Sequence, residues 1–167
     1  MQLDGVFPDS ISLMCILKSC SNIRDIEKGK QIHDEIVNRG LLEKNVALGN
    51  ALVDMYAKCG VLGKAREVLE DIPIRDIVSW NALITGYVEH EHCFEALNFF
   101  EQMQREGIIP DAITFTCILK ACGSLGMIDK GELIHQEIVS RNLLKNDIVL
   151  GNSLVDMYVK CAAMEKA

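Results

Sequence analysis

An eleven-residue run that occurs twice constrains the fold more than any other feature of this sequence. The stretch GNALVDMYAKC at Gly49–Cys59 returns 102 positions later as GNSLVDMYVKC at Gly151–Cys161, with two exchanges of small side chains. At the same offset, about half of the positions in 10–65 match those in 112–167. A repeat of this extent predicts an architecture of stacked units, in which no unit buries its apolar face without a neighbour.

The repeat of 102 residues divides into three shorter units, each of which ends on Asp or Asn before a new apolar helical pattern begins. The predicted complete units contain 36, 31, 35 and 36 residues. We expect the chain to begin and end inside repeats. The predicted segments are 1–9 (the end of a unit), 10–45, 46–76, 77–111, 112–147 and 148–167 (a truncated unit).

Each complete unit is predicted to form two helices. In 46–76 the apolar residues recur at helical spacing in two stripes, separated by Gly60. The stripes are Leu48, Leu52, Met55, Tyr56 and Cys59, then Ala65, Val68, Leu69 and Ile72. We expect Gly60, Gly86 and Gly123 at or near the turns between paired helices, and Pro73 and Pro110 after second helices. The fold class indicated is all-α, an α-solenoid of stacked antiparallel helix-turn-helix repeats.

Composition excludes several classes of protein. Acidic residues outnumber basic ones by 24 to 17, for a net charge of −7, so binding to a polyanion would need a local basic patch. Seven Cys is an odd number, and nothing else looks secreted, so we expect reduced, buried thiols. We expect a soluble protein, because no apolar run approaches the length of a membrane span and no signal or transit peptide is visible at the start.

A second row of residues lies on each first helix, roughly opposite the apolar stripe. In 46–76 these residues are three, four and four positions apart, which places them on one side of a helix. The rows are Ala47, Asn50, Asp54 and Lys58; Ile11, Met14, Lys18 and Asn22; Val78, Asn81, Thr85 and Glu89; and Ile113, Thr116, Lys120 and Ser124. For a single repeat, solvated helix surface would be the better interpretation. The recurrence favours a groove in which each unit binds one base of single-stranded RNA.

The sequence resembles a pentatricopeptide repeat protein of the plant organellar type that alternates standard, long and short motifs. VSWNALITGYVEHEHCFEALNFFEQMQREGIIPD resembles the standard motif, and ITFTCILKACGSLGMIDKGELIHQEIVSRNLLKND resembles the long one. VALGNALVDMYAKCGVLGKAREVLEDIPIRD resembles the short motif. The resemblance covers the whole chain and implies a right-handed superhelix, with long motifs at 10–45 and 112–147, a short motif at 46–76 and a standard motif at 77–111.

The resemblance implies that the fifth and last residues of a motif together select a base and that the second residue helps to sandwich it. The implied base-selecting residues are Asn50 with Asp76, Asn81 with Asp111, Thr116 with Asp147, Met14 with Asn45, and Asn152. Both Asn and Asp pairs imply a pyrimidine with uracil favoured, and the Thr and Asp pair would imply guanine in a standard motif. The implied sandwiching residues are Ile11, Ala47, Val78, Ile113 and Val149.

Lys58 and Lys160 match a family position at which Lys meets the RNA backbone, and Glu89 departs from that pattern. These local cations would offset the acidic total, since the second helices carry many of the carboxylates and should present them outward.

The function implied is sequence-specific binding of single-stranded RNA, one base per repeat, as the targeting array of an RNA-processing factor in the mitochondrion or chloroplast. The mixed motif lengths imply C-to-U RNA editing, with a deaminase-like domain outside this chain or in a partner, and small organellar editing cofactor proteins bound to the long motifs. Two alternatives stay open. One is a protein-binding scaffold of the tetratricopeptide sort, and the other is a factor for RNA stabilisation or splicing.

No residue pattern indicates an enzyme, a cofactor or a small-molecule substrate. HDE at His33–Glu35 and HQE at His135–Glu137 mimic half of a zinc deaminase signature, but no Cys-x-x-Cys follows. The pairs Cys15 with Cys20 and Cys117 with Cys122 point about 140° apart on a helix, which suits packing better than one metal. The cluster HEHC at His90–Cys93 is expected at a helix turn.

Overall fold

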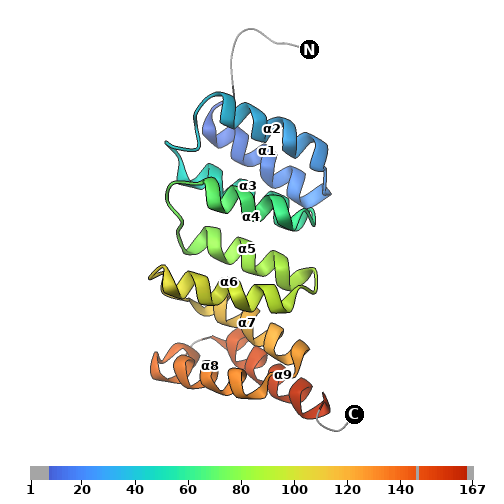
Figure 1. The fold of residues 1–167 in the computed structure, drawn as a ribbon, viewed down its shortest axis with the longest axis vertical. Coiled ribbons are helices and arrows are strands. Elements are labelled where there is room, and N and C mark those ends of the chain that lie inside the picture. Colours follow the sequence, from blue (N-terminus) through green and yellow to red (C-terminus); the bar gives the residue numbers. More distant parts are fainter. Residues whose placement is uncertain (1–7, 146, 165–167) are drawn as a thin grey trace. The chain divides into compact units, whose positions relative to one another are not determined.

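The regular structure of the described residues is helical throughout. In a computed structural model of the chain, residues 8–145 and 147–164 are described (Figure 1). Their elements are α1 (Ser10–Ile23), α2 (Ile26–Asn38), α3 (Val46–Lys58), α4 (Leu62–Asp71), α5 (Ile77–Glu89), α6 (Cys93–Arg105), α7 (Ala112–Leu125), α8 (Ile128–Ser140), a short 3-10 turn η1 (Leu143–Lys145) and α9 (Ile148–Met164). This confirms the all-α fold class, and each complete predicted unit contains two α-helices.

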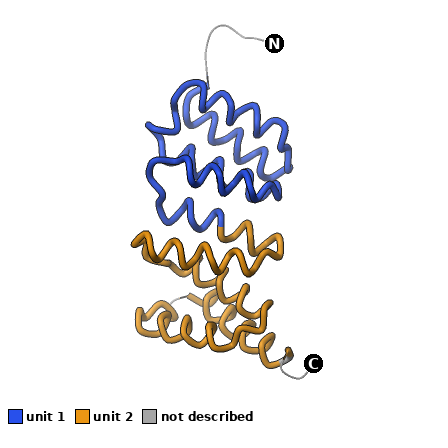
Figure 2. The backbone as a smooth tube through the Cα atoms, in the orientation of Figure 1, with its two compact units in different colours: residues 1–83 blue, residues 84–167 orange. Residues whose placement is uncertain are grey.

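The chain divides into two compact units, residues 1–83 and 84–167, with the boundary inside α5 (Figure 2). In unit 1, α1 packs against α2 and α3, and α3 packs against α4. In unit 2, α7 packs against α6, α8 and α9, and α8 also contacts α9. Within each unit, therefore, a first helix touches its own partner helix and the first helix of the next repeat, as the repeat pattern predicts.

The two apolar stripes predicted for 46–76 form the core of unit 1. Leu48, Leu52 and Met55 of α3 are fully buried, and Cys59 just beyond the helix is half-buried. The second stripe, on and just after α4, is buried along its whole length. Burial of such side chains stabilises the fold by about 1.5–3 kcal/mol each.

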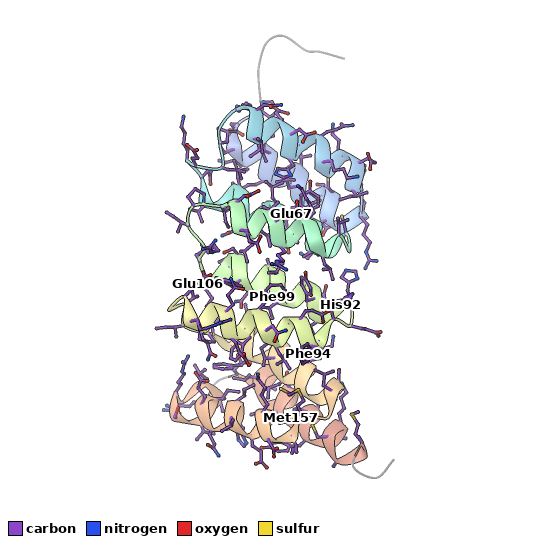
Figure 3. All side chains as sticks on the ribbon, viewed as in Figure 1. Glu67, His92, Phe94, Phe99, Glu106 and Met157 are labelled. Atoms are coloured by element: carbon purple, nitrogen blue, oxygen red, sulfur yellow. The ribbon has the colours of Figure 1, made fainter. Side chains whose placement is uncertain are left out.

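The contacts between helices recur with the same spacing as the sequence repeat. A Cβ at Gly29 would lie 2.5 Å from Sδ of Met55, and a Cβ at Gly131 would lie 2.5 Å from Sδ of Met157, whose place in α9 is labelled in Figure 3. Arg39 and Arg141 are also equivalent in the repeat. Arg39 donates to the carbonyl oxygen of Pro8 at 2.9 Å, and Arg141 donates to that of Pro110 at 3.0 Å. Both units therefore contain the same two contacts at equivalent positions of the sequence repeat.

The Asp or Asn that closes each repeat caps the helix that follows. Each side chain accepts a hydrogen bond from a backbone N–H in the first turn, which satisfies a donor without an intrahelical partner. The bonds are Asp9 with Ser12 (2.8 Å), Asn45 with Ala47 (3.1 Å), Asp76 with Ser79 (2.9 Å), Asp111 with Thr114 (3.0 Å) and Asp147 with Leu150 (2.9 Å). The cap holds the pKa of Asp9 below its usual range. Helix capping is thus one physical reason for the recurrence of Asp and Asn at these positions.

The turns between paired helices depend on residues with positive φ. Gly60 has φ 78° and ends α3, which confirms the prediction for that glycine. Gly86 and Gly123 lie near the turns, as predicted, within the last turns of α5 and α7, and the turns themselves contain Glu91 (φ 65°) and Gly126 (φ 66°). Gly123 has a packing reason to be small, since its Cβ would lie 3.2 Å from the Cα of Met157.

Candidate nucleic-acid interface

The row predicted on α3 lies outside the core of unit 1. Ala47 is exposed, while Asn50, Asp54 and Lys58 are half-buried. Intervening apolar residues such as Leu52 point into the core. The row therefore forms a polar surface on the first helix, as the helical spacing predicts.

Asn50 and Asp76 are in direct contact in unit 1, although 26 residues separate them in sequence. The amide nitrogen of Asn50 donates to both carboxylate oxygens of Asp76, at 3.1 and 3.2 Å. Asp76 is itself fixed, because it caps α5 through Ser79. The carbonyl oxygen Oδ1 of Asn50 is buried and has no hydrogen-bond partner among the described residues. Asp76 therefore sets the orientation of the Asn50 amide and leaves its acceptor unsatisfied.

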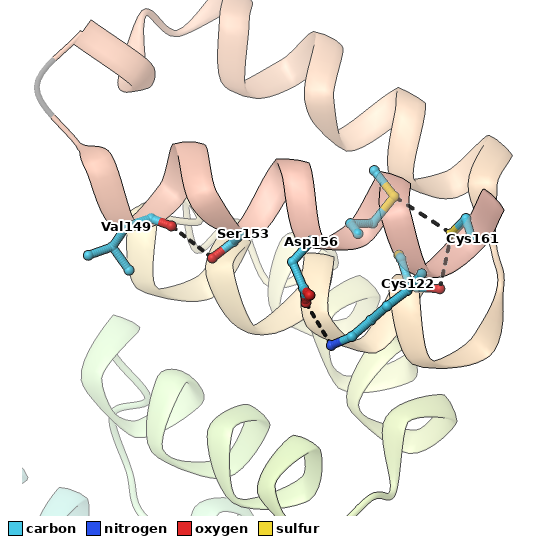
Figure 4. Close-up of polar contacts among 7 residues, drawn as sticks. Cys122, Val149, Ser153, Asp156 and Cys161 are labelled. Atoms are coloured by element: carbon cyan, nitrogen blue, oxygen red, sulfur yellow. Dashed lines mark hydrogen bonds and ion pairs between the residues drawn. The ribbon is translucent and has the colours of Figure 1, made fainter. Parts of the chain in front are cut away.

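A depression of about 290 Å³ lies between α7 and α9 in unit 2. It brings together three predicted site residues, Thr116 of α7 with Val149 and Asn152 of α9. Three further residues complete the lining, Lys120, Ser153 and Asp156. The Ser153 hydroxyl donates to the backbone oxygen of Val149, as Figure 4 shows, whereas Asn152 is exposed.

Two other predicted base-selecting pairs are not joined in this way. Among the described residues no hydrogen bond joins Thr116 to Asp147 or Met14 to Asn45, and Asp147 and Asn45 cap their helices. Met14 is half-buried on α1. In the remaining pair, Asn81 is buried on α5 in unit 1, and Asp111 caps α7 in unit 2.

The predicted sandwiching residues leave their side chains in solvent. The exposed fractions are 66% for Ile11, 56% for Val78, 59% for Ile113 and 65% for Val149, and Ala47 is also exposed. Single exposed aliphatic residues are common on proteins, but here they recur at one place on each first helix. They provide apolar surface beside the polar positions of the same rows.

The two lysines predicted to meet RNA phosphates are ion-paired. Nζ of Lys58 lies 2.9 Å from the carboxylate of Asp54, and Nζ of Lys160 lies 2.6 Å from that of Asp156. Both pairs join residues four apart on one helix, and the dashed line from Asp156 in Figure 4 marks the second. The sequence carried this signal, because Asp and Lys at this spacing face each other on a helix. Lys120, which the sequence places in the same row as Thr116, also lines the depression in unit 2.

Carboxylates of the second helices face solvent, as expected. Glu67 and Glu70 on α4 are exposed, and Figure 3 labels Glu67 on that helix. They form ion pairs along the helix with Lys64 and Arg66, respectively. These short surface pairs contribute little to stability.

The His-x-Glu patterns belong to the packing between helices. Nδ1 of His33 is hydrogen-bonded to the Tyr56 hydroxyl at 2.9 Å, and Nδ1 of His135 to the Tyr158 hydroxyl at 3.0 Å. Burial raises the pKa of Tyr56 to about 12. His33 and Tyr56 also line a depression of about 670 Å³ in unit 1, together with charged residues of α2 and α4.

The expectation that the thiols are buried is wrong for Cys15, because residues five apart on a helix point to different faces. Cys20 and Cys122 are buried, whereas Cys15 is exposed and Cys117 is half-buried. Burial raises the pKa of Cys122 to about 11, so its thiol stays protonated at neutral pH. Among the described residues no cluster of His, Cys, Asp and Glu could hold a metal ion, and no helix there is long and apolar enough to cross a membrane.

Family models of pentatricopeptide repeats match most of the middle of the chain. The PPR repeat family model matches residues 75–124, and the PPR repeat model matches 50–77 and 113–143. Together these matches span 50–143, which is more than half of the 167 residues.

Three Arabidopsis thaliana proteins are among the most similar relatives. The pentatricopeptide repeat-containing protein At2g13600 is 38% identical over 100% of this chain and 24% of its own length. The mitochondrial protein At1g06140 is 34% identical, with coverage of 100% and 30%, and the chloroplastic protein At1g15510 is 37% identical, with coverage of 98% and 19%. The chain thus spans less than a third of each of these curated relatives.

Solved structures show the same fold. The crystal structure of the maize pentatricopeptide repeat protein PPR10 superposes with a TM-score of 0.75 and 25% identity, over 98% of this chain and 24% of that one. PPR10 in complex with an 18-nt psaJ RNA element gives a TM-score of 0.74 at 17% identity, with coverage of 94% and 23%. With its helical pairs, its repeating contacts and these matches, the chain belongs to the pentatricopeptide repeat family and has the α-solenoid fold.

Proposed function

We propose that this chain binds single-stranded RNA in a sequence-specific manner, one base per repeat, as the targeting array of an organellar RNA-processing factor. The observation that carries the proposal is the contact between Asn50 and Asp76, in which a fixed carboxylate orients an amide with a free acceptor. The depression lined by Thr116, Val149 and Asn152 adds a second place where polar and aliphatic row residues meet. The maize protein of the same fold has been crystallised with RNA.

The chemistry at Asn50 suits a pyrimidine, with uracil favoured. Uracil presents an N3–H donor at the centre of its pairing edge, whereas cytosine presents an acceptor there and has its donor on the exocyclic amino group N4. With Nδ2 of Asn50 held by Asp76, the amide offers only the acceptor Oδ1. An unsatisfied buried acceptor costs about 1–3 kcal/mol, which a donor from the base would recover. Since Oδ1 is shielded from solvent in the RNA-free chain, neighbouring side chains must move to admit the base while Nδ2 stays bonded to Asp76.

The affinity of this chain for RNA is expected to be low. Its predicted complete repeats are 10–45, 46–76, 77–111 and 112–147, so it offers about four bases, each worth roughly 1–3 kcal/mol when stacked. The ordering of RNA and side chains opposes that gain. Binding should therefore be measured at low salt, where phosphate attraction is strongest.

The proposal is tested by exchanging one base-selecting residue at a time. Selection of bound sequences from a randomised RNA pool should shift the preferred base at a single position for Asn50→Thr and at a different single position for Asn81→Thr. Asn98→Thr, on the exposed surface of α6, is the matched control and should leave selection unchanged. Unchanged selection by both row variants, with folding intact by circular dichroism, would remove the basis for the proposal. Failure of wild-type protein to retard any single-stranded RNA on a low-salt gel would favour a protein-binding scaffold.

The more specific part of the proposal is C-to-U editing of organellar transcripts. The order of long, short and standard motifs in 10–111 supports it, as do relatives named as mitochondrial and chloroplastic proteins. Catalysis would come from a deaminase-like domain elsewhere in the full-length protein or from a partner, and small editing cofactor proteins would contact the long motifs 10–45 and 112–147. Sequencing the full-length coding region and the organellar transcripts of a loss-of-function line tests this. Unedited sites in that line support editing, whereas altered transcript ends or introns with all sites edited would favour stabilisation or splicing.

A further inference from the structure

The charges along the first-helix rows differ between repeat types. The third and fourth row positions hold Asp and Lys on α3 and on α9, and these residues form ion pairs at 2.9 and 2.6 Å. On α1 and α7 the third position holds Lys18 and Lys120, and the fourth holds uncharged Asn22 and Ser124. The rows of α1 and α7 therefore each carry one net positive charge, whereas those of α3 and α9 carry none.

Lys18 and Lys120 have no carboxylate on their own helix close enough to neutralise them. One turn to either side of Lys18 lie Met14 and Asn22, and one turn to either side of Lys120 lie Thr116 and Ser124. Both lysines are exposed, and neither forms a hydrogen bond or ion pair with any residue that the structure describes. By contrast, a phosphate that approaches Lys58 or Lys160 meets an ammonium group whose charge is already offset by a bound carboxylate.

Lys120 also lies beside predicted base-selecting residues, where it could reach the phosphate of a bound nucleotide. It lines the 290 Å³ depression together with Thr116 and Asn152, both predicted base-selecting residues. Residues four apart on a helix have Cβ atoms about 6 Å apart, so a base held at Thr116 leaves its own phosphate within reach of the Lys120 side chain. Glu89 and Glu91 line a neighbouring depression of about 360 Å³ that Lys120 also borders, but neither carboxylate is ion-paired with it.

We propose that Lys18 and Lys120, rather than Lys58 and Lys160, are the phosphate-binding cations of the array. This inference rests on the proposed binding of RNA. The long repeats thus anchor the RNA backbone through unpaired ammonium groups, and the short repeats present a neutral surface to it. Each phosphate contact in a single-stranded complex releases counterions and contributes a slope of about −0.7 to the plot of log K against log salt concentration.

The test is a salt titration of a fluorescent oligouridine against wild-type chain and charge variants. Lys18→Gln and Lys120→Gln should each reduce the magnitude of the slope by about 0.7, and together by about 1.4. The double variants Asp54→Asn with Lys58→Gln, and Asp156→Asn with Lys160→Gln, remove a neutral pair and should leave the slope unchanged. Asp54→Asn alone frees Lys58 and should make the slope steeper by about 0.7. Lys30→Gln, an exposed lysine on α2, is the charge-matched control and should have no effect on the slope.

The possible results separate this inference from the proposed function. If wild-type chain binds with a salt-dependent affinity, and the slope falls with the pair variants but not with Lys18→Gln and Lys120→Gln, the assignment of the cations is wrong while RNA binding stands. If wild-type chain binds no oligouridine or mixed-sequence RNA even at the lowest salt, both proposals are overturned. All these substitutions are at the surface, and circular dichroism of each variant checks that the helices are retained.

Discussion

Helices α3 and α9 carry nearly the same eleven residues but lie in different surroundings. In both, the Leu and Met of the run are buried, and the Tyr hydroxyl is hydrogen-bonded to a His of the preceding α-helix, although Tyr158 is only half-buried. On α3, Asn50 is bonded to Asp76, and Ala57 is only 1% exposed. On α9, Asn152 is exposed, and Val159, at the position equivalent to Ala57, is 62% exposed. The run itself therefore determines the helix and its buried stripe. The surroundings of each helix determine the burial and hydrogen bonding of the other residues in the run.

The ends of the two helices differ for a local reason. α3 ends at Lys58, and the turn that follows uses Gly60 with φ 78°. The equivalent residue after α9's run is Ala162, for which a left-handed conformation costs about 1–2 kcal/mol. α9 accordingly continues through Ala162 to Met164. The exchange of Gly60 for Ala162 at the equivalent position is thus consistent with the different ends of the two helices.

The comparison is tested most strongly at the glycine that begins each run. A Cβ at Gly49 would lie 2.6 Å from Cγ2 of Ile72, whereas a Cβ at Gly151 would meet nothing within 4 Å. Gly49→Ala should therefore destabilise the chain by about 1–3 kcal/mol through overpacking. Gly151→Ala should stabilise it by about 0.5–1 kcal/mol, since Ala favours the helix. Urea unfolding measures the change in the free energy of unfolding for both variants. Equal changes would show that Ile72 does not make the site of Gly49 tighter than that of Gly151.

The turn residue gives a smaller effect. Gly60→Ala should destabilise the chain by about 1 kcal/mol, because Ala must adopt positive φ or α3 must extend as α9 does. Ala162→Gly, the reverse exchange, should cost roughly 0.5 kcal/mol or less near a helix end. Thermal unfolding compares the two, and a larger loss for Ala162→Gly than for Gly60→Ala would contradict the explanation of where the helices end.

The smallest expected effect is a pH dependence at His33, which bonds to Tyr56 of α3. Burial lowers the pKa of His33, the nearby Lys64 of α4 lowers it further, and Asp34 and Asp71 oppose the shift. A histidine with a lowered pKa in the folded state binds protons more readily when unfolded, so stability should fall as the pH drops below about 6.5. His33→Gln should weaken this dependence between pH 7 and pH 5. An equally steep dependence in that variant would assign the effect to other groups.

Helical periodicity predicted the all-α fold, the helix pairs and the buried stripe of α3, because each depends on residues close in sequence. Helical periodicity could not predict features that depend on residues distant in sequence. The approach of Gly29 to Met55 and the bond between His33 and Tyr56 join different helices, and spacing within one helix carries no sign of them. The turn expected at His90–Cys93 is confirmed, but its positive φ at Glu91 was not predicted, because a non-glycine residue seldom adopts that conformation.

At the candidate site, too, spacing in the sequence indicated which residues of one helix lie together, but not which distant residues make contact. Spacing alone indicated that Asn50 and Lys58 share a face of their helix, and it also carried the signal for the ion pair of Lys58 with Asp54. The recurrence of Asp at the ends of repeats suggested base selection, and the structure adds a second cause, since these residues cap the next helix. Two requirements can fall on one side chain, as they do at Asp76, which both caps α5 and orients Asn50.

The central claim is that RNA binds along the first-helix rows, and amide NMR spectra of the chain with and without oligouridine at low salt test it most directly. We predict that the side-chain amides of Asn50 and Asn152 and the backbone amide of Thr116 shift on titration. The residues of α2 around the 670 Å³ depression, such as Lys30 and Asn38, should stay unchanged. Shifts confined to α2 and α4, or no shifts at saturating RNA, would contradict the account.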